Sequence, residues 1–234
     1  MNRPERRLPE TPGWAFVAIL CAILIPSGAQ ADCRDKPGPA VDWAGCSKER
    51  LMLNGSDLAA GIFENAFLSG TTFEGASLAG ANLQRSELVR SSFIGADLTG
   101  ANLEKALASR SDFSQANLRG ARLVKAEFLR VSFVGADLTD ADLGGGDFYR
   151  NDFRDATMTG ANLRGAIMPR TVFAGASMEG VNMAGAILMK TRFDKVDLSG
   201  VTGLEQSQLD QACGDAETVL PAGLTVPAHW PCPE

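Results

Sequence analysis

The stretch Ala96-Asp97-Leu98-Thr99-Gly100-Ala101-Asn102-Leu103 contains the repeat that decides the fold. Leucine, phenylalanine or methionine occupies every fifth residue from Leu53 to Leu198, and Ala108 is the one exception among these thirty positions. A helix has a period of 3.6 residues and a strand a period of two, so neither produces a strict period of five. A fixed internal period of this kind indicates a stacked-repeat architecture.

The phenylalanines show a longer period within the same repeat. They recur every twenty residues, at Phe73, Phe93, Phe113, Phe133, Phe153, Phe173 and Phe193. Twenty residues are four pentads, so we expect the chain to return to the same place after four straight sides, with successive coils about 4.8 Å apart. The phenylalanines would then form one internal ladder of stacked rings. Thirty pentads predict a solenoid of about seven and a half coils.

The pentads of Ala96–Leu103 resemble the repeat of the pentapeptide-repeat proteins, in which a small residue and Asp or Asn precede a central Leu or Phe. That family folds as a right-handed quadrilateral β-helix, so the resemblance implies an all-β solenoid over residues 51–200. Departures from the pattern are sparse; examples are Asn151 and Val181 at the small position and Ala108 at the centre. We expect Ala108 to leave a small void or an inward shift, at a cost of about 2–3 kcal/mol if nothing compensates.

The N-terminus has the features of a secretory signal peptide over residues 1–31. Three arginines precede the apolar run Trp14–Ile25, and Ala29-Gln30-Ala31 fits the cleavage rule. The run is shorter than the ~20 residues that span a bilayer, although an uncleaved anchor is the alternative. We therefore expect a periplasmic or secreted bacterial protein with no stable membrane span after cleavage.

Small caps are expected at both ends of the repeat, because a solenoid otherwise exposes unpaired strand edges. Residues 32–50, with several prolines and Trp43, are the expected N-terminal cap. Residues 201–234 are the expected C-terminal cap, with a short helix over Glu205–Ala212. Cys213-Gly214 would end that helix, because glycine permits the left-handed conformation at a helix terminus.

Four cysteines remain after signal cleavage: Cys33, Cys46, Cys213 and Cys232. An even number in an exported chain favours disulfides, and sequence alone allows three pairings. We favour Cys33–Cys46 and Cys213–Cys232, because each pair flanks the repeat on one side. A metal site built from Cys213, His229 and Cys232 is the competing interpretation, but it lacks an obvious fourth ligand.

Charge and composition argue against nucleic-acid binding and against catalysis. The chain has a net charge of −6, and residues 51–200 carry 17 acidic and 15 basic side chains, so there is no basic field for nucleic acid. His229 is the only histidine, which makes a Ser-His-Asp site hard to build across the array. No glycine loop typical of phosphate binding appears, and carboxylate pairs such as Asp140 and Asp142 are more often solvated. We predict neither an enzyme nor a cofactor.

One side of the predicted coil differs from the others. Its pentads are centred on Leu68, Leu88, Ala108, Phe128, Phe148, Met168 and Leu188, and one outward column runs Arg90, Arg110, Arg130, Arg150, Arg170 and Lys190. The side also carries outward apolar residues: Phe67, Val89, Leu107, Leu129, Tyr149, Ile167, Ile187 and Met189. Arginine mixed with aromatic and aliphatic residues is typical of interface cores. The alternative is an ordinary surface on which arginine stems cover the apolar groups.

These observations favour a non-catalytic protein-interaction or structural scaffold in the bacterial envelope. The partner is an unknown protein or a second copy of the chain. The family resemblance also suggests a DNA mimic that protects topoisomerase, but that role needs a strongly acidic rod in the cytoplasm. A polysaccharide-active β-helix enzyme is a third possibility, disfavoured because the array has no insertions and no catalytic cluster.

Overall fold

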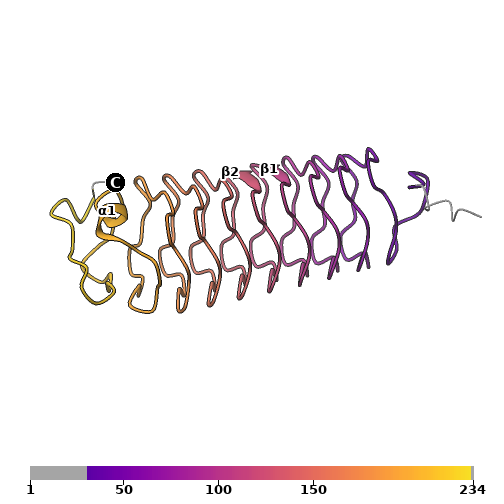
Figure 1. The fold of residues 1–234 in the computed structure, drawn as a ribbon. Coiled ribbons are helices and arrows are strands. Elements are labelled where there is room, and N and C mark those ends of the chain that lie inside the picture. Colours follow the sequence, from indigo (N-terminus) through magenta and orange to yellow (C-terminus); the bar gives the residue numbers. More distant parts are fainter. Residues whose placement is uncertain (1–30, 233–234) are drawn as a thin grey trace, which may run out of the picture. The chain divides into compact units, whose positions relative to one another are not determined.

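The computed structural model describes residues 31–232, so most of the predicted signal peptide (1–31) lies outside the described residues. Residues 42–202 form stacked coils joined by parallel bridges between positions twenty residues apart, and the bridges Arg192↔Cys213 and Asp197↔Val219 join the last coil to the C-terminal segment (Figure 1). Four bridge positions recur in each coil, as in Met52↔Thr72, Asp57↔Ser77, Ile62↔Asn82 and Phe67↔Glu87. The chain therefore follows the four-sided path that the twenty-residue period predicts.

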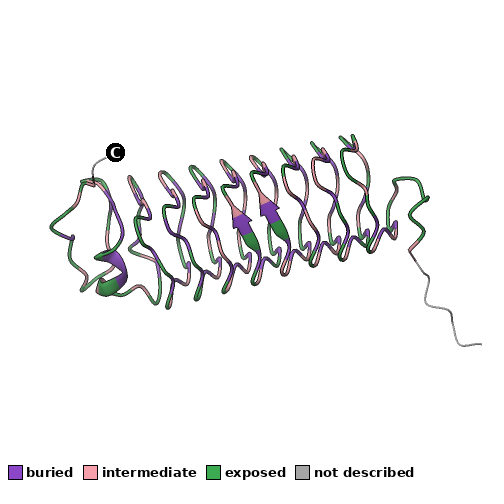
Figure 2. Cartoon of the chain, turned by 90° about the horizontal axis from the view of Figure 1, so that it is seen from above, coloured by how far each residue is buried: buried purple, intermediate pink, exposed green. Residues whose placement is uncertain are grey.

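Each pentad turns because its residues alternate between interior and surface and its last residue bends the backbone. Ala96 and Leu98 are fully buried, and Gly100 has a φ of 63°. The Ala96 amide donates to the Phe93 carbonyl across the corner, at 3.0 Å. The Leu98 amide donates to the backbone carbonyl of Asn117 in the next coil, at 2.7 Å, and the corresponding bonds recur along the array. Backbone groups are thus paired between coils. Buried and more exposed residues alternate along each coil, as the colours of Figure 2 show.

Regular secondary structure is sparse because the straight pieces between corners are short. The strands are β1 (Leu107–Ser109) and β2 (Glu127–Leu129), which pair in parallel with Ala108 opposite Phe128. The described residues contain one helix, α1 (Gln206–Leu209). The remaining pairings are isolated bridges.

The phenylalanines that recur every twenty residues stack inside the solenoid. From Phe73 to Phe193, successive ring centroids lie 4.5 to 5.5 Å apart, with interplanar angles of 0 to 22°. Phe73, Phe113 and Phe193 are fully buried, as are the four between them. The ladder makes this side of the coil, here called the phenylalanine side, a continuous aromatic wall of the core.

The neighbouring coil compensates for Ala108, where a void or an inward shift was expected. Phe128 stands directly beside Ala108 in the next coil, and its ring centroid lies 5.5 Å from Phe113, a residue of the Ala108 coil. The Phe128 centroid also lies 6.0 Å from Phe133. The larger ring thus occupies the space beside the smaller residue, and both are buried.

A column of buried hydroxyls joins successive coils at one corner. The hydroxyls of Thr71, Ser91, Ser111, Thr171 and Thr191 each donate to the carbonyl 23 residues earlier, at 2.5 to 2.8 Å. Asn151 belongs to the same column, and its Oδ1 accepts from the Val131 amide at 2.8 Å. Asn151, which departs from the repeat, therefore also contributes a hydrogen bond between successive coils.

The N-terminal segment extends the solenoid as well as closing it. The bridge Asp42↔Ile62 joins residues 32–50 to the next coil, and Val41, Trp43 and Cys46 already follow the buried positions of the pentad. The Trp43 Nε1 donates to the Asp35 carbonyl at 3.2 Å. Cys33 and Cys46 form a disulfide with a Cα–Cα distance of 5.5 Å.

The C-terminal segment folds over the last coil. Gln208 of α1 donates through Nε2 to the carbonyls of Met183 and Ala186, at 3.0 and 2.8 Å. Glu205 and Gln208 form a capping box at the helix start. The helix ends at Leu209, so the expected span of Glu205–Ala212 was too long at both ends.

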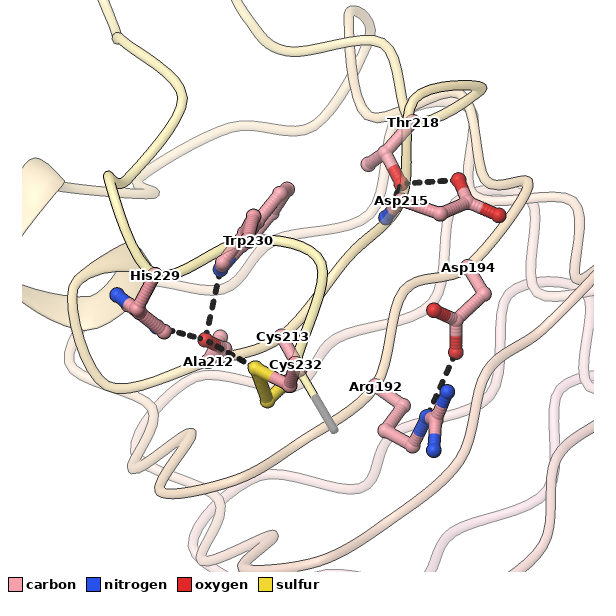
Figure 3. Close-up of a disulfide and its surroundings, with 9 residues drawn as sticks. All are labelled: Arg192, Asp194, Ala212, Cys213, Asp215, Thr218, His229, Trp230 and Cys232. Carbon is pink, nitrogen blue, oxygen red and sulfur yellow. Dashed lines mark hydrogen bonds and ion pairs between the residues drawn. A yellow bond between two sulfur atoms is a disulfide. The ribbon is translucent and has the colours of Figure 1, made fainter. Parts of the chain in front are cut away.

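Gly214 does not end this helix as expected, because it serves a different contact. Asp210 is the C-cap and adopts a right-handed conformation. A Cβ on Gly214 would collide with the Trp230 ring, so glycine permits the tail to lie against this part of the cap. Cys213 and Cys232 form the second disulfide beside that contact (Figure 3).

Candidate interaction face

The candidate site is one side of the coil, here called the arginine side, formed by residues 67–70, 87–90 and the equivalent residues of each later coil to 187–190. Its outermost feature is the cation column, which consists of Arg90, Arg110, Arg130, Arg150, Arg170 and Lys190. All six side chains are exposed. Parallel bridges such as Glu87↔Leu107 and Ile167↔Ile187 hold the coils of this side in register.

The cation column occupies backbone positions that favour glycine. All six residues have φ angles of 57 or 58°. A left-handed conformation costs a residue with a Cβ roughly 1–2 kcal/mol. Glycine fills the equivalent position at Gly80, Gly100 and Gly120 on another side. The local turn therefore does not explain six consecutive long cations, which points to a role for their side chains.

Among residues 31–232, the cations of the column have no counter-ion within pairing distance. Seven ion pairs occur among residues 31–232, and none includes a member of the column. Glu87, Glu127 and Asp147 lie on the same side but are not within pairing distance of these cations. Adjacent unit charges about 4.8 Å apart repel by about 0.9 kcal/mol in unscreened water. An anionic partner would relieve this repulsion.

Exposed apolar side chains also concentrate on the arginine side. Ten large hydrophobic residues are exposed in the described part of the chain, and five belong to this side: Phe67, Leu107, Ile167, Ile187 and Met189. Met189 is 50% exposed. Val89, Leu129 and Tyr149 are half-buried, and the Arg150 guanidinium lies 5.4 Å from the Tyr149 ring centroid. Covering by neighbouring side chains thus explains part of the apolar surface and leaves five residues open.

A hollow that the repeat pattern did not predict lies at the N-terminal end of this side. Gly70 interrupts the line between Arg50 and Arg90, and a space of about 190 Å³ opens there. Glu49 and Glu87 also line it. The signal was present, because Arg50 stands at the same pentad position two coils before Arg90. The hollow gives the otherwise regular side a distinct end.

The titratable groups with shifted pKa values lie on other sides of the solenoid and, for Asp215, in the C-terminal cap. A hydrogen bond from Lys105 lowers the pKa of Glu104, and Arg122 acts in the same direction against desolvation. A hydrogen bond to Asp152 raises the pKa of Arg154. These shifts arise from surface ion pairs. They do not gather around one cleft as the groups of an active site do.

The single histidine has a structural contact in the C-terminal cap. The Ala212 carbonyl lies 2.8 Å from both His229 Nε2 and Trp230 Nε1 (Figure 3). His229 therefore helps to hold the tail beside the Cys213–Cys232 disulfide. Between residues 31 and 232 there is no group of three or more His, Cys, Asp or Glu residues placed to hold a metal ion. In the same part of the chain, no helix is both long and apolar enough to cross a membrane.

Comparison with solved structures finds proteins with stacked pentapeptide coils. HetL from the cyanobacterium Nostoc sp. strain PCC 7120, described as involved in regulating heterocyst differentiation, is 19% identical, with 79% of this chain and 85% of HetL covered and a TM-score of 0.45. Full-length QnrB1, a plasmid-mediated fluoroquinolone resistance protein, is 17% identical, with 77% and 91% covered and a TM-score of 0.39. A pentapeptide repeat protein of the Arabidopsis thaliana thylakoid lumen is 29% identical, with 51% and 66% covered and a TM-score of 0.24.

No curated protein sequence matches the chain significantly. The model of the pentapeptide repeats matches with eight copies, over residues 53–88, 91–128, 132–168 and 170–202. These matches follow the five-residue period and the twenty-residue bridges described above. The chain is therefore a member of the pentapeptide-repeat family.

Proposed function

We propose that this protein is a non-catalytic interaction scaffold of the bacterial envelope and that its arginine side binds the partner. The observation that carries the proposal is the cation column. Six consecutive coils keep a long cation at a position where glycine would cost less, and none of the six has an ion pair within the described residues. Five exposed apolar side chains lie beside them. Cations that are free to pair, set among apolar groups, are typical of protein interfaces.

The envelope location rests on the ends of the chain. The signal-like residues 1–31 favour export, and the two disulfides favour an oxidising compartment. The pentapeptide-repeat family consists largely of structural and interaction proteins, which supports a role without catalysis. The partner is expected to present acidic and apolar groups along an extended surface, because cationic and apolar side chains lie beside each other along the arginine side.

The test is affinity capture from the envelope fraction with a tagged protein and two matched variants. The first carries Arg130→Ser, Tyr149→Ser and Arg150→Ser, all on the arginine side. The second carries Arg85→Ser, Lys105→Ser and Lys125→Ser on a neighbouring side, where the backbone has the same left-handed conformation, with φ angles of 55 to 57°. Circular dichroism and thermal unfolding check that both variants fold.

We expect the first variant to lose at least tenfold of the captured partner and the second to retain it. Equal capture by both variants would show that the arginine side does not bind the partner. Recovery of the tagged protein in the cytoplasmic fraction alone would remove the envelope location.

A further inference from the structure

The charges of the coil are divided between its opposite sides. The arginine side carries six basic and three acidic side chains between residues 67 and 190. The acidic side, here defined as residues 57–60, 77–80 and the equivalent residues of each later coil to 197–200, lies ten residues away along each coil and therefore opposite. It carries Arg119 and six acidic side chains: Asp57, Asp97, Asp137, Asp140, Glu179 and Asp197. The two sides have net charges of +3 and −5, so each solenoid presents a basic and an acidic face in opposite directions.

We infer that the arginine side of one copy binds the acidic side of a second copy, so that the solenoids associate side by side. This inference rests on the proposed function, because it names the partner of the arginine side. Charge complementarity carries it: the chain itself holds a column of cations that form no ion pair among residues 31–232 and, on the opposite side, a surface rich in carboxylates.

The carboxylates of the acidic side are held in place before any contact forms. Asp97 Oδ1 accepts from the Thr99 amide at 3.0 Å and from its hydroxyl at 2.6 Å. Asp57 and Asp197 accept from the amides of Ala59 and Ser199, at 3.1 and 2.8 Å. Among the ion pairs of the described residues, Arg119–Asp137 is the one that engages a carboxylate of this side. Asp57, Asp97 and Asp197 therefore stay available to a second molecule at little further cost in conformational entropy.

The spacing of the charges matches between the two sides. The cation column repeats every coil from Arg90 to Lys190, and Asp57, Asp97 and Asp137 repeat every second coil, so the carboxylates fall on multiples of the cation spacing. Two solenoids with the same rise of about 4.8 Å per coil keep these charges in step along their whole length. A partner built from an extended strand places side chains of one face roughly 6.6 Å apart and falls out of step. The match therefore favours a second solenoid over a strand.

The two sides also differ in side-chain size. Several outward positions of the acidic side hold small residues, such as Ala59, Ala79 and Gly100. The long side chains of the arginine side can lie across that surface, with their stems covering the alanines. Each contact uses two different surfaces, so it is heterologous and does not close: every added copy leaves one free arginine side and one free acidic side.

Sedimentation velocity at low ionic strength tests this association with the purified protein and two variants. Arg110→Glu with Arg150→Glu disables the arginine side, and Asp57→Lys with Asp97→Lys disables the acidic side. All four positions are outward-facing, and circular dichroism checks the fold. Wild-type protein should form assemblies whose mean mass rises several-fold above the monomer with concentration and returns to the monomer at 0.5 M NaCl.

Each variant alone should remain monomeric, because a contact between two copies of the same variant always includes the disabled side. The equimolar mixture should form a one-to-one complex and stop there, because one intact side remains on each variant. Self-association of either variant, or a mixture that stays monomeric, would overturn the heterologous contact. A monomeric wild type that still captures an envelope partner through the arginine side would overturn this inference and leave the proposed function standing.

Discussion

The pairing of Ala108 with Phe128 offers a sharp test of how the interior is packed. Ala108→Leu restores the regular repeat at its position, yet it adds three carbon atoms where the Phe128 ring already lies. Overpacking of this kind costs about 1–3 kcal/mol. Phe128→Leu removes part of that ring and leaves space beside Ala108, at a cost of about 1–2 kcal/mol. Both sites are at most 1% exposed, so neither change can relax into solvent.

The double variant should recover most of the loss, because leucine on leucine is the packing found elsewhere in the array. We expect it to unfold within about 1 kcal/mol of the wild type, which gives a coupling free energy of about 2 kcal/mol. Equilibrium unfolding in guanidinium chloride measures all four proteins of this cycle. Leu98→Phe is the control, because it adds a ring between leucines and should only destabilise. Additive losses in the double variant would refute the compensation by Phe128.

Three further predictions concern single contacts. Arg130→Gly should leave the free energy of unfolding unchanged or raise it by up to about 1 kcal/mol, because the relief of left-handed strain is partly offset by a more flexible unfolded chain. Gly120→Arg should lower the free energy of unfolding, and thermal unfolding compares the two variants. Thr171→Val should lower the free energy of unfolding by about 1–3 kcal/mol, because the Phe148 carbonyl loses its hydrogen bond of 2.6 Å from the Thr171 hydroxyl. Thr202→Val is the milder control in the same denaturant titration, because the Thr202 hydroxyl makes a longer, half-buried bond of 3.3 Å to the Val181 carbonyl. The pKa of Asp215 is lowered because hydrogen bonds from Lys195, Thr218 and Glu217 outweigh the desolvation of its carboxylate. The contribution of Asp215 to stability is therefore present above its ordinary pKa and is lost as the pH falls through the lowered value. Asp215→Asn should remove that contribution and flatten the acid dependence of cap unfolding, which hydrogen exchange measures.

The architecture could be predicted from the sequence because one short rule repeats without insertions. A large apolar residue such as Leu98, two positions after a small one such as Ala96, fixes which side chains face inward, and the register of coils follows from the phenylalanine period. The same regularity explains why the arginine side could be picked out as a candidate. Its residues stand at equal spacing, and the structure places them on one surface.

Features that depend on contacts between coils could not be predicted in the same way. The donation from Thr171 to the Phe148 carbonyl joins residues 23 positions apart, a distance that reflects the shape of the corner and has no simple pattern in the sequence. Phe128 compensates for Ala108 through the direction of its ring, which the repeat does not specify. Gly214 is a residue type that commonly ends helices, but its close approach to Trp230 depends on the path of the C-terminal tail. The unpaired state of the cation column likewise required side-chain positions.

Site-specific photo-crosslinking in cells tests the role of the arginine side most directly. A photoreactive residue in place of Met189, which is 50% exposed on that side, is compared with one in place of Ile94, which is 37% exposed on the phenylalanine side. We predict discrete crosslinked species from position 189 and none from position 94. Equal crosslinking from both positions, or none from position 189, would contradict the claim that the arginine side is the surface through which this protein acts.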